Sequence, residues 1–143
     1  MKPIRVHGLP LHPVFVHFPV AAWTVATGLA LLAPLEIAKE APRLALYANA
    51  FGLLAGVVAM TAGFLELVSL PSDKTLRDAI ARHMTLAVSA WFAYLVMWVL
   101  QMKSLAFAAA VAGMIGFVLL LAAGHAGAQI VYRHGFPGRQ ESQ

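Results

Sequence analysis

The sequence predicts an all-α membrane protein, built from four transmembrane helices in an antiparallel up-and-down bundle. Hydrophobic residues make up 61% of the chain and charged residues only 11%, whereas globular domains are roughly half apolar and a quarter charged. The apolar residues form continuous runs of about twenty residues, the length that a helix needs to cross the hydrocarbon of a bilayer. Membrane β-strands would alternate instead, so these runs predict helices.

The first helix is expected over residues 13–33, after a lead that we interpret as an interfacial arm. Pro13 suits the first helical turn, where its missing N–H costs nothing. Pro19 removes a backbone hydrogen bond, so it is expected to kink the helix beside His17. Pro34 then ends the helix.

The rest of the chain follows the same pattern, with short connections and no domain boundary or repeat, so residues 1–143 form a single transmembrane domain. The polar stretch over residues 72–82 is expected to form an amphipathic turn that leads into the third helix. The other helices and the polar tail are predicted over residues 44–70, 83–102, 105–132 and 133–143. Because the connections are short, neighbouring helices should run antiparallel.

Composition excludes several classes of chemistry. The chain has no cysteine, which rules out disulfides, iron–sulfur ligation, covalent haem attachment and thiol catalysis. The net charge of +4 comes from basic residues in short caps and loops between apolar runs. This placement is typical of membrane topology, so the expected partner is the lipid bilayer and not a nucleic acid.

The positive charges also predict an orientation. Three cations lie on the side away from the termini: Lys39, Arg43 and Lys103. Seven lie on the terminal side: Lys2, Arg5, Lys74, Arg77, Arg82, Arg133 and Arg139. The positive-inside rule then places both termini in the cytoplasm of a bacterial cell, with the protein in the inner membrane.

An up-and-down bundle gathers five of the six histidines at its terminal end. The polar residues expected there are His12, His17, Glu66, His83, His125 and His134. Several of them continue columns of small residues at helical spacing. His17 precedes Ala21, Thr24 and Gly28; Glu66 follows Gly52, Gly56, Ala59 and Gly63; His83 precedes Ala87, Ala90 and Tyr94. Small residues favour close helix contact in membranes, so these columns should face the interior, and inward ionisable residues are functional candidates.

The preferred hypothesis is a b-type haem protein that acts in electron transfer. The first and third helices lie diagonally in a square bundle, so His17 and His83 could bind one iron from opposite faces. Arg82 would meet the haem propionates, and the reserve ligands are His134, His125 and His12. No nucleophile motif or paired carboxylates are present, which favours an electron-transfer module over a stand-alone enzyme. A quinone, or a membrane or soluble redox protein, is the expected redox partner.

Other interpretations remain open. A transition metal ion such as zinc, iron or copper could bind to His17, His83, His125 and Glu66. The chain could also be a cofactor-free structural or assembly subunit, working as a homodimer or within a larger complex. Each histidine could simply bond to a neighbouring carbonyl, and Glu66 could pair with Arg82 or Arg77.

Motifs at both ends of the chain resemble a known family. They are His12-Pro13, His17-Phe18-Pro19, Glu66, His83, Gly124-His125-x-Gly127 and Val131-Tyr132-x-His134-Gly135. Together they resemble the small bacterial membrane proteins filed as domain of unknown function 2231, over nearly the whole chain.

The resemblance implies that His12, His17, His83 and His134 are the recurrent histidines, with Glu66 where an aspartate is commoner. His125 stands where many relatives carry tryptophan, and Ala128 replaces a usual glycine, which favours His134 over His125 as a ligand. The family is similar to proteins joined to cytochrome-type and Rieske-type modules, and this implies redox work.

Overall fold

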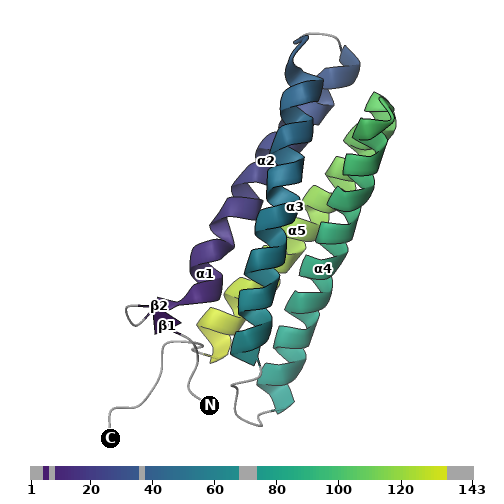
Figure 1. Ribbon diagram of the computed structural model, residues 1–143. Helices are drawn as coiled ribbons and strands as arrows, with labels where there is room; N and C mark the ends of the chain where they lie inside the picture. The colour runs from purple at the N-terminus through teal and green to yellow at the C-terminus, as the bar shows by residue number, and fades with distance from the viewer. Residues whose placement is uncertain (1–4, 7–8, 36–37, 68–73, 135–143) are drawn as a thin grey trace, which may run out of the picture.

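The computed structural model describes residues 5–6, 9–35, 38–67 and 74–134. Its long helices form an antiparallel bundle (Figure 1). The helices are α1 (Leu11–Phe15), α2 (His17–Leu32), the 3-10 turn η1 (Ala33–Leu35), α3 (Ala41–Leu67), α4 (Lys74–Met102) and α5 (Ala106–His134). Two short antiparallel strands, β1 (Arg5–Val6) and β2 (Leu9–Pro10), pair in the lead, with Arg5 opposite Pro10 and Val6 opposite Leu9.

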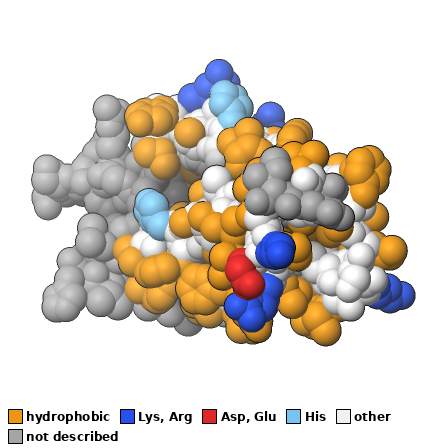
Figure 2. Space-filling view, turned by 90° about the horizontal axis from the view of Figure 1, so that it is seen from above, with side chains coloured by type: hydrophobic (Ala, Val, Ile, Leu, Met, Phe, Trp, Pro, Cys, Tyr) orange, Lys and Arg blue, Asp and Glu red, His pale blue; other side chains and the backbone are white. Residues whose placement is uncertain are grey.

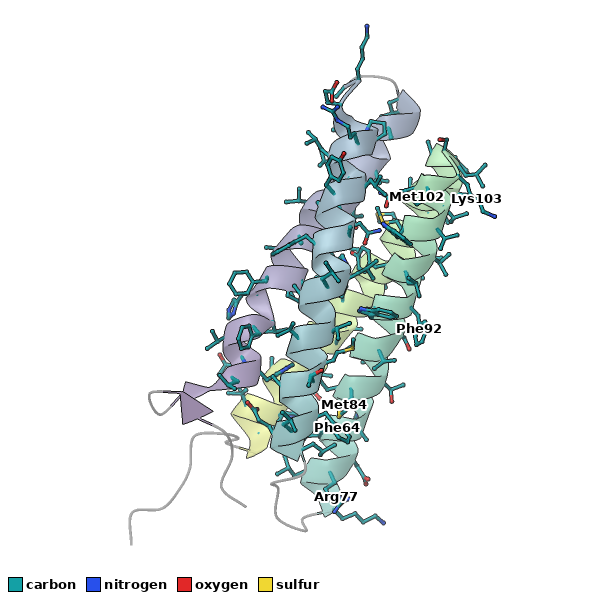
Figure 3. The ribbon with its side chains drawn as sticks, viewed as in Figure 1. Phe64, Arg77, Met84, Phe92, Met102 and Lys103 are labelled. Atoms are coloured by element: carbon teal, nitrogen blue, oxygen red, sulfur yellow. The ribbon has the colours of Figure 1, made fainter. Side chains whose placement is uncertain are left out.

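Among the described residues, four segments are long and apolar enough to cross a membrane, so the predicted all-α transmembrane fold is confirmed. They are Leu11–Leu32, Ala41–Leu67, Lys74–Met102 and Ala106–Arg133. Hydrophobic side chains cover much of the described surface seen from one end of the bundle (Figure 2). Arg77 lies near the start of α4 and Lys103 directly after its end, with the exposed Phe92 between them (Figure 3). The protein is therefore a multi-pass membrane protein.

Helix boundaries differ from the sequence prediction mainly at α4. This helix begins at Lys74 rather than near residue 83. The polar stretch forms its first turns because Leu76 and Ile80 are buried on one face while Arg77 and Asp78 stay exposed. The expected amphipathic turn is confirmed, and it continues directly into the transmembrane helix. The end predicted for the second helix, residues 68–70, lies outside the described residues.

The first transmembrane segment is broken at Val16, between α1 and α2. Pro19 has no N–H to donate to the carbonyl of Phe15, and its ring crowds that carbonyl. Hydrogen bonds continue on either side of the break, from Val16 N to His12 O at 3.0 Å and from Val20 N to Val16 O at 3.3 Å. The helix assignment is therefore interrupted next to Pro19, while Val16 itself keeps helical dihedral angles.

The four long helices pack as two hairpins, α2 with α3 and α4 with α5, which also meet across α2–α5 and α3–α4. Helices α2 and α4 thus lie on a diagonal. The hairpins are joined at mid-bundle by the rings of Trp23 and Tyr94, which stack with centroids 4.6 Å apart and planes 1° apart. The Tyr94 hydroxyl also hydrogen-bonds with Thr27 Oγ1 at 2.9 Å.

Small-residue columns do not all face inward. Gly52, Gly56 and Ala59 are buried on α3, as predicted, but Ala21, Thr24 and Gly28 are exposed on α2. The prediction for this helix was wrong because the glycines of α3 leave space for a large partner rather than for another small column. Trp23 fills that space, so α2 turns its bulky face inward and its small face outward.

Gly52 and Gly28 provide a matched test of this packing. A Cβ at Gly52 would lie 2.5 Å from Trp23 Nε1, whereas a Cβ at Gly28 meets nothing within 4 Å. We expect Gly52→Ala to lower the free energy of unfolding by about 1–3 kcal/mol through overpacking. Gly28→Ala should raise it by up to about 1 kcal/mol through helix propensity. Denaturant unfolding in detergent measures both, and equal effects would contradict this account.

Candidate functional site

His12 is held against α3 by three contacts, two of its ring and one of its backbone. Its Nδ1 lies 2.8 Å from the carbonyl oxygen of Ala59, and its backbone N–H donates to Glu66 Oε1 at 3.0 Å. The ring packs on Gly63, where a Cβ would lie only 2.9 Å from His12 Nδ1. Glycine at this position is therefore what allows the imidazole to approach the helix.

His83 is held in a matching way against α5. Its Nδ1 lies 2.9 Å from the carbonyl oxygen of Ala123, and its ring packs on Gly127, whose Cβ would lie 3.2 Å from Cε1. A carbonyl oxygen can only accept, so Nδ1 carries the hydrogen in both histidines. The Nε2 atom of each neutral ring therefore carries a lone pair.

These two imidazoles approach each other across the bundle diagonal. Their ring centroids are 6.0 Å apart, and their planes make an angle of 82°. They come from the two hairpins of the bundle, so the packing of the hairpins sets the distance between them. Both side chains are half-buried.

A cavity of about 460 Å³ adjoins the histidine pair at the end of the bundle where α1 and the start of α4 lie. Its walls are mainly apolar, and among its lining residues are His12, His17, Glu66 and His83. A smaller cavity of about 90 Å³ shares His12 and His83 and extends to Trp23. The two imidazoles thus line a space of the size that small-molecule sites occupy, roughly 300–1,000 Å³.

Comparison with known proteins bears on the family. The family model described as predicted membrane protein (DUF2231) matches residues 8–138. The chain belongs to this family. No curated protein and no solved structure matches it. The resemblance inferred from the histidine motifs is thereby confirmed.

Three other predicted site residues of this DUF2231 protein are exposed: His17, Arg82 and His125. His17 is exposed at the edge of the cavity. His125 is exposed on α5 and accepts a hydrogen bond from Gln129 Nε2 at 2.8 Å. His134 is the last residue of α5, and its side chain lies outside the described residues. Arg82 is exposed beside His83.

Glu66 is buried, with 8% of its surface exposed. Within the described part of the chain, the only ion pair joins Arg43 to Glu40, so Glu66 pairs with neither Arg82 nor Arg77. No three His, Asp or Glu side chains among the described residues are grouped to hold one metal ion. The set of His17, His83, His125 and Glu66 is accordingly not assembled into one group.

The sequence prediction missed the inward position of His12. It assigned the inward direction to His17 because that residue continues the small column of α2. Two signals point to His12 instead: a spacing of five residues turns His12 and His17 to different faces of the helix, and Gly63 on α3 leaves room for a ring.

Proposed function

We propose that the protein binds b-type haem and transfers electrons in the membrane, with His12 and His83 as the axial ligands of one iron. The observation that carries this proposal is the imidazole pair, in which each Nδ1–H is bound to a carbonyl and each Nε2 is left to bind a metal. Metal-ligating histidines almost always donate their second ring N–H in this way, which fixes both tautomer and ring orientation.

The spacing of the rings supports this assignment. Two imidazoles that bind one metal from opposite sides, with bonds of about 2 Å, have centroids roughly 6 Å apart. The centroids of His12 and His83 are 6.0 Å apart. This pair replaces His17 and His83 as the preferred ligands, since His17 is exposed on the far side of the break at Val16.

The surroundings also suit a large, flat and mostly apolar group. The cavity walls include Val16, Met84 and Ile130, and Gly63 and Gly127 keep the backbone close behind the two rings. At the same end of the bundle, Arg82 and Arg133 are exposed, where they would meet haem propionates.

Axial ligation by two histidines favours electron transfer over catalysis. A haem held by His12 and His83 would supply the gain and loss of one electron, and the two imidazoles would leave no place for a substrate to bind the iron. The residues of the chain then have three tasks: they bind the iron, hold the imidazoles through Ala59 and Ala123, and exclude water with apolar walls. A membrane quinone or a redox protein would supply or accept the electron.

The absorption spectrum of the purified protein tests the proposal. Protein expressed with ample haem should show a Soret band when oxidised and a sharp α band after reduction with dithionite. Colourless protein would overturn the haem proposal. Metal analysis of that colourless protein would then separate a metal site from a cofactor-free structural subunit.

We also propose that both termini face the cytoplasm of a bacterial inner membrane. Described cations at the terminal end are Arg5, Lys74, Arg77, Arg82 and Arg133, against Lys39, Arg43 and Lys103 at the other end. The positive-inside rule favours this orientation. A reporter that is active only in the cytoplasm should therefore work when fused after Gln143, and a periplasmic reporter fused there should be inactive. The opposite pattern would reverse the orientation.

A further inference from the structure

Helix α1, which carries His12, is short and half-exposed. It contains five residues, none of which is fully buried, and the break at Val16 separates it from α2. His83, in contrast, lies inside the 29-residue helix α4. The two proposed ligands therefore differ in how firmly the chain fixes them.

Glu66 is placed to hold α1 in position. Its Oε1 accepts a hydrogen bond from the backbone N–H of His12, the second residue of α1, 54 positions away in the sequence. The first N–H groups of a helix have no partner within the helix, so an acceptor from α3 satisfies one of them. The carboxyl group has no cation partner among the described residues. We therefore take the hydrogen bond to His12 as the interaction that explains its buried position.

We infer that Glu66 is the positioning residue that docks α1 on α3 and thereby keeps His12 at the candidate haem site. This inference rests on the proposed function for what His12 binds, but the docking of α1 itself does not depend on haem. Without this contact, α1 would be held on α3 mainly by the His12 ring against Ala59 O and Gly63. His12 would then be the more easily displaced of the two proposed ligands, and His83 would remain. His12 is thus the exchangeable ligand of the pair.

Two replacements of similar length test the acceptor oxygen of Glu66 separately from the size of its side chain. Glu66→Gln keeps one oxygen that can accept from His12 N–H, whereas Glu66→Met keeps the length but has no comparable acceptor. We expect E66Q to retain the low-spin spectrum of an iron with two histidine ligands. E66M should become high-spin and, once reduced, should bind carbon monoxide at least about tenfold more tightly than E66Q, in the range that outer-sphere partners of metal ligands control.

Glu40→Leu provides a control at the other end of the bundle, where Glu40 pairs with Arg43. It should leave the spectrum unchanged. An E66M protein that stays low-spin would overturn the inference, and so would an E66Q protein that behaves like E66M.

Thiol labelling tests the docking of α1 without haem. The chain has no cysteine, so Phe15→Cys introduces a single thiol at a half-buried position of α1. In this background, E66M should raise the rate of modification by a maleimide about tenfold or more, as expected for loss of a hydrogen bond to a charged acceptor, and E66Q should raise it much less. Val14→Cys, which is already exposed, should be insensitive to the replacement of Glu66.

The two measurements distinguish the two proposals. If the wild-type protein is colourless but E66M still speeds labelling, the haem proposal is wrong and the inferred role of Glu66 stands. If the Phe15→Cys thiol is labelled at the same rate with Glu66 and with Met at this position, the inferred role of Glu66 is wrong, whatever the spectrum shows.

Discussion

Replacement of His83 by alanine is expected to abolish haem binding, and replacement of His12 by alanine should remove the low-spin spectrum. His83 is fixed by Ala123 O and Gly127 within a long helix, so its loss leaves only a ligand on the weakly held α1. Loss of His12 leaves the iron on His83 alone. Haem content per protein and the spectrum of the reduced form measure both effects.

Two other histidines serve as controls. His17→Ala and His125→Ala should keep both the haem content and the low-spin spectrum, because His17 is exposed at the cavity edge and His125 is exposed and paired with Gln129. This comparison separates the pair that faces across the bundle, His12 and His83, from the pair predicted from the sequence, His17 and His83. If His17→Ala removed haem while His12→Ala did not, the assignment of His12 would be wrong.

The fold could be predicted from the sequence because the physics of the bilayer leaves few alternatives. Continuous apolar runs must be helices, and short connections such as Lys103–Ser104 force neighbouring helices to run antiparallel. The structure closes this turn with Ser104 at a positive φ of 56°. This topology gathers His12, His17, His83, His125 and His134 at one end of the bundle. The end of the bundle that holds the candidate site could therefore be predicted from the sequence.

The identity of the facing pair could not be predicted, for two physical reasons. Small residues mark places where helices approach closely, but the partner can be a small residue or a large ring. Trp23 on Gly52 and His12 on Gly63 are cases of the second kind. In addition, the groups that fix the imidazoles are the carbonyls of Ala59 and Ala123. Every residue has a carbonyl, so such acceptors leave no trace in the sequence.

Tyr94→Ala is expected to have the largest effect on stability. Tyr94 is fully buried, stacks on Trp23, and packs on Gly116, whose Cβ would lie 2.9 Å from its ring. Truncation leaves a cavity between the hairpins and removes the hydrogen bond to Thr27. By analogy with other buried aromatic residues, the free energy of unfolding should fall by about 3–5 kcal/mol.

A tyrosine on the lipid-facing surface gives the matched control. Tyr47 on α3 is 62% exposed, so Tyr47→Ala should change the free energy of unfolding by no more than about 0.5 kcal/mol. Tyr94→Phe keeps the ring and loses only the hydroxyl, which should cost about 1 kcal/mol. Denaturant unfolding in detergent measures all three variants, and a similar effect at positions 94 and 47 would contradict the proposed core.

The same residue links stability to the site. Tyr94 and Trp23 join α4 to α2, and this contact sets how far apart the α2–α3 and α4–α5 hairpins lie at mid-bundle. His12 and His83 belong to opposite hairpins, so their 6.0 Å separation depends on that spacing. We therefore expect folded Tyr94→Ala to bind haem more weakly than Tyr94→Phe, although neither replacement touches the cavity. Equal haem affinity in the two variants would show that the end of the bundle sets the histidine distance independently of its centre.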